Sequence, residues 1–203
     1  MVRRVHFILP MLLLLVIFLT GCPKRIPERV PEVPPYENPV FKILNAFAPA
    51  ESFRAKASIR VDAVSKGEAM NFLLNGIVLF QKPDKLRIQG YHPFGMGVFD
   101  AVYRNGEFFL LSPLQRKAYT GEIGEFEGVM EKSDVRVLLE NPDNKEIPTR
   151  IRIELKKKEA SVELRLKDIA FHPTLPEDAF DWKVPEGVDV QPLSKLIKGK
   201  REE

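Results

Sequence analysis

Apolar and polar residues alternate along several segments of this 203-residue chain, and this alternation constrains the fold more than any other feature. In residues 52–62 every odd position from Phe53 to Val61 is apolar, and the even positions between them are polar or charged. Successive side chains of a strand point to opposite faces of a sheet, so the pattern predicts a strand with one buried face and one solvated face. Residues 85–90, 150–156 and 161–167 repeat it. The chain is therefore expected to be mainly antiparallel β.

Residues 70–81 are different, because both faces of the strand that they predict are largely apolar. Such a strand needs packing partners on both sides of the sheet. This is the strongest hint in the sequence that another element covers the second face.

Turn signals separate the remaining strands. Asn105-Gly106 is a strong hairpin signal, and further turns are expected at Lys66-Gly67 and Pro83-Asp84, with strands at 108–111 and up to about residue 120. A terminal strand bounded by prolines is expected between residues 171 and 184. Seven to nine strands without βαβ alternation predict a strongly curved antiparallel sheet, an incomplete β-barrel.

Helical patterns are few. Phe41, Leu44 and Phe47 have helical spacing, and Asn38 before Pro39 is a plausible helix start. Between residues 121 and 141 the spacing predicts two short helices, the first on Ile123, Phe126 and Met130 and the second on Val135, Leu138 and Leu139. These helices would form a lid over the sheet and enclose an apolar cavity.

The turn at residues 93–97 has an unusual composition. Pro93, Gly95 and Gly97 are turn formers, but the side chains between them are Phe94 and Met96, where a solvent-exposed turn is usually polar. We expect an apolar hairpin tip. The alternative is that Phe94 packs under a neighbouring loop.

The N-terminus has the features of an export signal. Arg3 and Arg4 precede an apolar run at about residues 7–19, which is short for a membrane-spanning helix. The run ends in Leu-Thr-Gly-Cys, which resembles a bacterial lipobox, and Cys22 is the single cysteine of the chain. The lipobox implies removal of residues 1–21 and acylation of Cys22, which would hold the mature protein on a membrane.

Residues 22–40 then form a spacer. Six prolines between positions 23 and 39 predict an extended, semi-rigid segment. The residue after the cysteine is Pro23. The resemblance to proteobacterial lipoproteins, in which an aspartate at that position retains the protein in the inner membrane, implies the periplasmic face of the outer membrane. The β domain is expected at residues 41–192, and a charged tail at 193–203.

Candidates for chemistry are weak. His92 and His172 have no metal-ligand spacing, and Glu177, Asp178 and Asp181 are better explained as a solvated turn than as acid/base machinery. No phosphate-binding loop or nucleophile elbow is present, and a formal charge of +3 gives no sign of nucleic-acid binding. We therefore expect no enzyme, no metal and no cofactor.

Several motifs together resemble the lipoprotein-localisation superfamily of LolA-like carriers and LolB-like outer-membrane receptors. They are Lys-Pro-Asp-Lys-Leu-Arg-Ile-Gln-Gly, His-Pro-Phe-Gly, Asn-Gly and Ala-Tyr-Thr-Gly in order from Lys82, with a closing segment from Phe171 to Val190 that is more like the carriers. The resemblance implies an open β-barrel with a helical lid that binds acyl chains. It also implies that Phe94, at the place of an exposed leucine in the receptors, inserts into the membrane, with Met96 beside it.

The function expected from this resemblance is binding the acyl chains of lipoproteins, or other lipids, and helping to localise them to the outer membrane. A LolA-like periplasmic carrier is an expected partner, and the chain is expected to be a monomer. An alternative is an envelope scaffold or assembly lipoprotein with the same fold and a filled core. If there is a cavity, its expected lining is apolar and comes from two strands: Phe72, Leu74, Val78, Phe80, Leu86 and Ile88.

Overall fold

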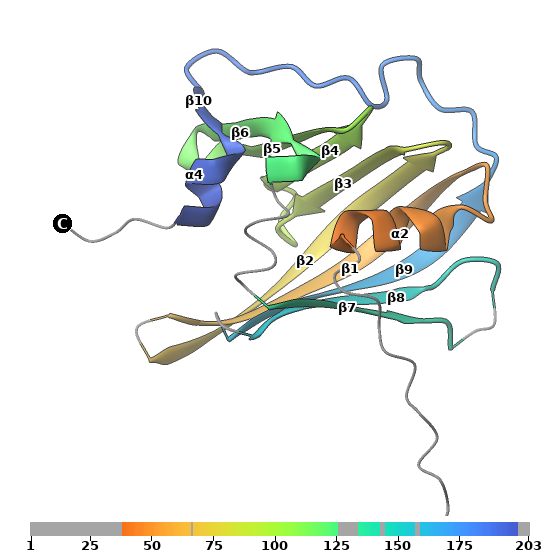
Figure 1. Cartoon of the computed structure of the whole chain (residues 1–203), viewed down its shortest axis with the longest axis horizontal. Coiled ribbons are helices and arrows are strands. Elements are labelled where there is room, and N and C mark those ends of the chain that lie inside the picture. Colours follow the sequence, from red (N-terminus) through yellow and green to blue (C-terminus); the bar gives the residue numbers. More distant parts are fainter. Residues whose placement is uncertain (1–37, 66, 126–133, 143–144, 157–158, 199–203) are drawn as a thin grey trace, which may run out of the picture. The chain divides into compact units, whose positions relative to one another are not determined.

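The computed structural model describes residues 38–198, apart from residues 66, 126–133, 143–144 and 157–158. In these residues ten strands form one curved sheet that does not close on itself (Figure 1). This confirms the predicted fold class, with more strands than expected. The strands are β1 Ser52–Ser65, β2 Glu68–Gln81, β3 Lys85–Tyr91, β4 Gly97–Arg104, β5 Glu107–Ser112, β6 Lys117–Glu122, β7 Val135–Glu140, β8 Arg150–Leu155, β9 Ala160–Phe171 and β10 Asp189–Pro192.

The strand order is β10-β6-β5-β4-β3-β2-β1-β9-β8-β7. All neighbours are antiparallel except β10 and β6, which are parallel. The long hairpin β1–β2, paired over fourteen positions from Ser52 with Gln81 to Ser65 with Glu68, is the centre of the sheet. The Asn105-Gly106 turn joins β4 to β5 as expected, with both residues at positive φ.

Helix α2, Pro39–Phe47, lies against one face of the sheet (Figure 1). The Asn38 side chain accepts a hydrogen bond of 2.9 Å from the Val40 backbone N–H, and Pro39 occupies the first turn, where its missing N–H costs nothing. The helix buries Ile43, Leu44 and Phe47. The predicted amphipathic helix is confirmed.

The main core lies between α2 and the sheet. Phe47 meets Phe53 edge-on with ring centroids 4.9 Å apart, and Phe53 stacks on Phe80 at 5.5 Å. Val78 and Ile59 are also fully buried there. The inward positions predicted for the late strands are correct for Ile151, Leu164 and Leu166.

The opposite face of the sheet is covered in part by residues 172–188, called the strap from here on. Its Leu175, Ala179, Phe180 and Trp182 pack on Leu79, Val102 and Phe109 and form a second apolar cluster. The cover expected for the second face of β2 therefore includes the strap. The terminal strand predicted at 171–184 was wrong, because this segment lies across the sheet instead of pairing with an edge; the last strand is β10.

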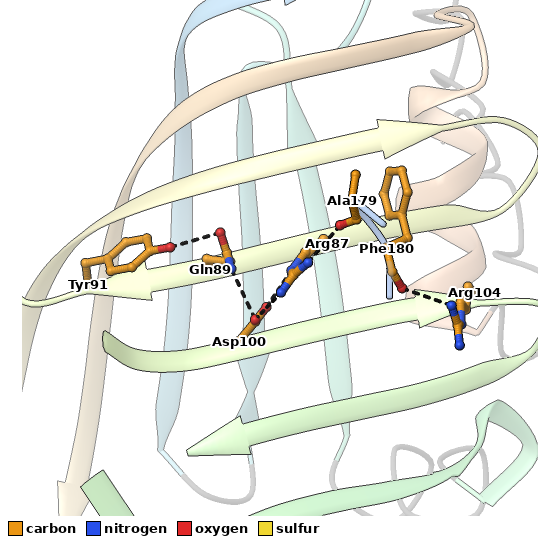
Figure 2. A network of polar contacts seen from close by, with 7 residues as sticks. All are labelled: Arg87, Gln89, Tyr91, Asp100, Arg104, Ala179 and Phe180. Atoms are coloured by element: carbon orange, nitrogen blue, oxygen red, sulfur yellow. Dashed lines mark hydrogen bonds and ion pairs between the residues drawn. The ribbon is translucent and has the colours of Figure 1, made fainter. Parts of the chain in front are cut away.

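Polar contacts hold the strap to β3 and β4 (Figure 2). Arg87 donates two hydrogen bonds to Asp100, at 2.9 and 2.6 Å, and a third, at 2.8 Å, to the Ala179 carbonyl. Arg104 donates to the Phe180 carbonyl at 3.3 Å and to Asp181 at 2.7 Å. The hydrogen bonds from Arg87 to Asp100 raise the pKa of the guanidinium above its ordinary value. This network explains how a segment without regular structure is fixed in place.

Two further predictions need correction. The second helix expected between 121 and 141 is strand β7, because Val135, Val137 and Leu139 share one face and pair with β8, and this period-two pattern outweighs the helical spacing of Leu138 and Leu139. Part of the expected charged tail is helix α4, Leu193–Lys198, whose Leu193 is fully buried. The first expected helix begins at Ile123, and the rest of it lies outside the described residues.

Candidate functional site

The turn between β3 and β4 presents Phe94 and Met96 to solvent. Gly95 has φ +86, a conformation that favours glycine, and its N–H donates to the His92 carbonyl at 2.7 Å. The His92 N–H in turn donates to the Met96 carbonyl at 2.8 Å, which closes the turn. Phe94 is 87% exposed and Met96 54% exposed. Phe94 therefore does not pack under a neighbouring loop.

Other large apolar side chains are exposed at the same end of the sheet. The ladders place the β1–β2, β3–β4 and β5–β6 turns at one end, since Asn75 pairs with Tyr91 and Ser112 with Lys117. The start of β10 lies there too, because Asp189 pairs with Lys117. We call this set the apolar end: Val64, Met70, Phe72, Leu73, Phe94, Met96, Leu114 and Val190.

The β1–β2 hairpin contributes to the apolar end from both of its faces. Phe72 lies on the face that carries Leu74 and Val78, whereas Leu73 lies on the opposite face, and the two are 51% and 55% exposed. Burial in the core cannot explain why an exposed strand is apolar on both of its faces. The hairpin end is thus a candidate contact surface alongside Phe94.

Four of the six residues expected to line a cavity are part of the packed core. Leu74, Val78, Phe80 and Leu86 are buried in the cluster that includes Phe47. Phe72 belongs to the apolar end, and Ile88 is half-buried beside the core.

The helix-covered face is less completely buried toward β4 and β5. Ile88, Phe99 and Phe108 pack against the edge of the core but stay partly accessible. Phe99 lies over Gly90, where an added Cβ would collide with the phenyl ring. The alternation in residues 85–90 assigned Ile88 to a face but did not show that this part of the face is more open than the part under α2.

A half-open pocket of about 590 Å³ lies along β1 on the face opposite α2. The turn residues His92, Pro93 and Gly95 border it, so it adjoins the apolar tip. Its charged lining was not anticipated from sequence, because Arg54 and Lys56 are on β1 whereas Lys167 and Asp168 are on β9, far along the chain. Ser58, Asn75 and Tyr91 also line the pocket.

Two carboxylates near this face have lowered pKa values. The pKa of Glu163 is lowered by hydrogen bonds from Arg165 at 2.5 Å and Arg152 at 2.7 Å, and the Glu163 side chain is only 6% exposed. The hydrogen bond from Lys56, at 2.9 Å, lowers the pKa of Asp168 in an exposed setting. Burial raises the pKa of the Tyr91 phenol, whose O–H donates to Gln89 (Figure 2).

The weak chemical candidates stay apart. His92 is in the β3–β4 turn and His172 is exposed beyond β9, while Asp181 pairs with Arg104 on the strap. Within the described ranges no group of three or more histidine, cysteine, aspartate or glutamate side chains is arranged to hold a metal ion. Among those residues no helix is long and apolar enough to cross a membrane. Cys22 and the signal segment lie outside the described residues.

No family model and no curated protein matches this chain. Solved structures similar to it include an uncharacterized conserved protein from Thermus thermophilus, with 12% identity, coverage of 75% of this chain and 98% of that one, and a TM-score of 0.43. A LolA superfamily protein from Nitrosomonas europaea has 13% identity, 70% and 97% coverage, and a TM-score of 0.42. A DUF1329 family protein from Desulfovibrio piger has 9% identity, 71% and 98% coverage, and a TM-score of 0.41. At these values the functional argument rests on the residues of this chain.

Proposed function

We propose that this protein is a lipid-anchored protein of the periplasmic face of the outer membrane that binds acyl chains of lipoproteins, or other lipids, and helps to localise them to that membrane. The observation that carries the proposal is the 87% exposure of Phe94 at an end of the sheet where other large apolar side chains are also exposed. Phenylalanine at a solvent-exposed turn is explained if the turn enters lipid.

The N-terminal sequence supports a membrane location for this apolar end. Acylation at Cys22 would attach the chain to a bilayer. The proline-rich segment that follows has 15 residues before Asn38, and at about 3.1 Å per residue an extended spacer would reach roughly 45 Å. The β domain would then be free to turn its apolar end toward the same membrane.

Acyl-chain binding is assigned to the open part of the helix-covered face. Ile88, Phe99 and Phe108 would receive the chain beside the core. Each CH₂ removed from water contributes about 0.8 kcal/mol, so a matched apolar surface can hold a chain without any chemical step. Delivery requires that the bilayer hold the cargo more favourably than the protein does. In this scheme the protein is not an enzyme, and a LolA-like carrier would supply the cargo.

Uptake of a fluorescent fatty-acid analogue by residues 23–203 tests the binding step. We expect saturable binding that Ile88→Glu weakens at least tenfold, since the variant places a charge on the proposed acyl site. Val184→Glu is the matched control, because Val184 is an exposed apolar residue of the strap outside that site. Absence of uptake by the unmutated protein would reject the proposal.

A second candidate function is a non-catalytic envelope scaffold or assembly lipoprotein with a filled core. The observation that favours it is the complete burial of Val78 and Phe80, with the Phe80 ring packed against the rings of Phe47 and Phe53. A scaffold would bind a protein partner and take up no fatty acid, so the uptake measurement separates the two functions.

A further inference from the structure

The pocket along β1 has a charge imbalance. Arg54, Lys56 and Lys167 supply three cations, whereas Asp168 is the one carboxylate in its lining. Asp168 is paired with Lys56 at 2.9 Å. Arg54 and Lys167 form no ion pair with another described residue, which leaves two cations of the pocket available to a ligand.

The neutral groups of the pocket complement these cations. Ser58 and Asn75 provide a hydroxyl and an amide, which are hydrogen-bond donors, and the pocket is also lined by Tyr91. A volume of about 590 Å³ is within the range of small-molecule sites and is larger than a single phosphate ion requires. Arginine and lysine beside neutral donors are the groups that bind phosphoryl oxygens.

The position of the pocket suggests when it would be filled. Pro93 and Gly95, which flank the exposed Phe94, border it. If Phe94 enters a bilayer, phosphate groups at the membrane surface come close to this turn. Lysine and arginine side chains close to an anionic membrane surface are attracted to it.

We propose that this pocket binds an anionic phosphoryl group, either of a phospholipid headgroup or of a soluble phosphate. A headgroup bound there would select the surface on which the apolar tip inserts. The inference deepens the proposed function and rests on it for the membrane orientation. Binding of the headgroup itself involves no acyl chain, so it is measured separately from cargo uptake.

The test uses the full acylated chain in maltoside micelles, which contain no phosphate. Glycerophosphoglycerol, glycerophosphocholine and inorganic phosphate are titrated while the NMR signals of the His92 ring and the Asn75 side-chain amide are followed. We expect saturable shifts with glycerophosphoglycerol and at least fivefold weaker binding of the zwitterionic glycerophosphocholine. Tighter binding of inorganic phosphate than of glycerophosphoglycerol would support the site and assign it to a soluble phosphate.

Charge-removing variants complete the test. Arg54→Gln with Lys167→Gln should weaken binding at least fivefold and leave the Lys56–Asp168 pair intact. The control, Arg136→Gln with Lys183→Gln, removes two exposed cations outside the pocket and should change binding less than twofold. No saturable binding of any probe, or equal weakening by both variants, would overturn the inference. Loss of fatty-acid uptake with intact headgroup binding would instead reject the acyl-binding function alone.

Discussion

The two ends of the sheet have opposite surface chemistry although the same strands form both. The end with the β2–β3 and β4–β5 turns, here called the polar end, has ion pairs between Lys82 and Glu51 at 2.7 Å and between Arg104 and Asp181 at 2.7 Å. Its Asn105-Gly106 turn consists of two residues that readily adopt the positive φ that the turn requires, and it has no large apolar side chain. The apolar end exposes Phe94, Met96 and their neighbours.

The contrast between the two ends distinguishes residues that the fold needs from exposed apolar residues that the fold does not explain. Both turns that flank β4 have residues suited to their backbone conformation: Asn105-Gly106 at one turn and Gly95 at the other, all at positive φ. Only the second adds large side chains that no part of the described structure buries. The polar end therefore shows what an ordinary end of this sheet needs, and the excess at the apolar end is the part that calls for a function.

The largest effect is expected from making the tip of the apolar end polar. Phe94→Glu with Met96→Glu should lower delivery of acylated cargo to vesicles at least about a hundredfold, because burial of each of the two apolar side chains contributes roughly 1.5 to 3 kcal/mol. Stability should change by less than about 0.5 kcal/mol, since both side chains are exposed. Transfer kinetics and urea unfolding check the two parts; unchanged delivery would remove the insertion role.

A smaller effect is expected at the β1–β2 hairpin. Leu73→Glu should weaken membrane association about tenfold, because a single 55% exposed side chain is lost from the same contact. Vesicle co-sedimentation measures it, with Val184→Glu as the control at an exposed apolar site outside the apolar end. Equal losses in the two variants would mean that the apolar end is not distinguished from other exposed apolar residues.

The next effect concerns stability and pH. Glu163→Gln should destabilise the protein by about 1 to 2 kcal/mol at pH 7 and leave delivery unchanged, because it weakens two charge-assisted hydrogen bonds to half-exposed arginines. The folded pKa of Glu163 is lowered, so its contribution is present above the unfolded pKa of about 4.3 and is lost as pH falls through the folded pKa. Urea unfolding between pH 7 and pH 3 should show the two proteins converging; a constant difference would contradict this origin.

The smallest effect is expected at the polar end. Lys82→Gln removes an ion pair with the 67% exposed Glu51 side chain and should change stability by less than about 0.5 kcal/mol, with no effect on membrane association. Thermal unfolding and co-sedimentation measure the two quantities. A loss of membrane association in this variant would remove the functional distinction between the ends.

The sequence was sufficient for the elements whose signals are local. Alternation gave β1, β8 and β9, Asn105-Gly106 gave the β4–β5 hairpin, and Asn38-Pro39 gave the start of α2. The sequence was not sufficient where long-range contacts determine the secondary structure. Residues 135–139 fit a helical spacing, but pairing with β8 fixes them as a strand. The apolar residues of the strap predicted a strand. They instead pack on the face of the sheet opposite α2, without pairing with any strand.

The candidate site was predicted only in part, because some of its residues give a local signal and others depend on long-range strand pairing. Phe94 and Met96 were recognised because an apolar residue in a turn is a local anomaly. Leu114, at 66% exposure, was missed, although Pro113-Leu114 offered a similar signal. The pocket that joins Arg54 to Lys167 depends on the pairing of β1 with β9, which no local pattern specifies.

The central claim is that the apolar end faces the membrane, and the depth of Phe94 tests it most directly. The experiment uses a Trp182→Phe background. This substitution removes no hydrogen bond, because the Trp182 indole N–H has no partner among the described residues. Two separate variants, Phe94→Trp and Glu107→Trp, then each place a single tryptophan at one end of the sheet. The full acylated protein is reconstituted into vesicles that contain brominated lipids. We expect strong quenching and a blue-shifted emission for tryptophan at position 94 and neither for position 107. Equal quenching at both positions, or none at position 94, would contradict the claim.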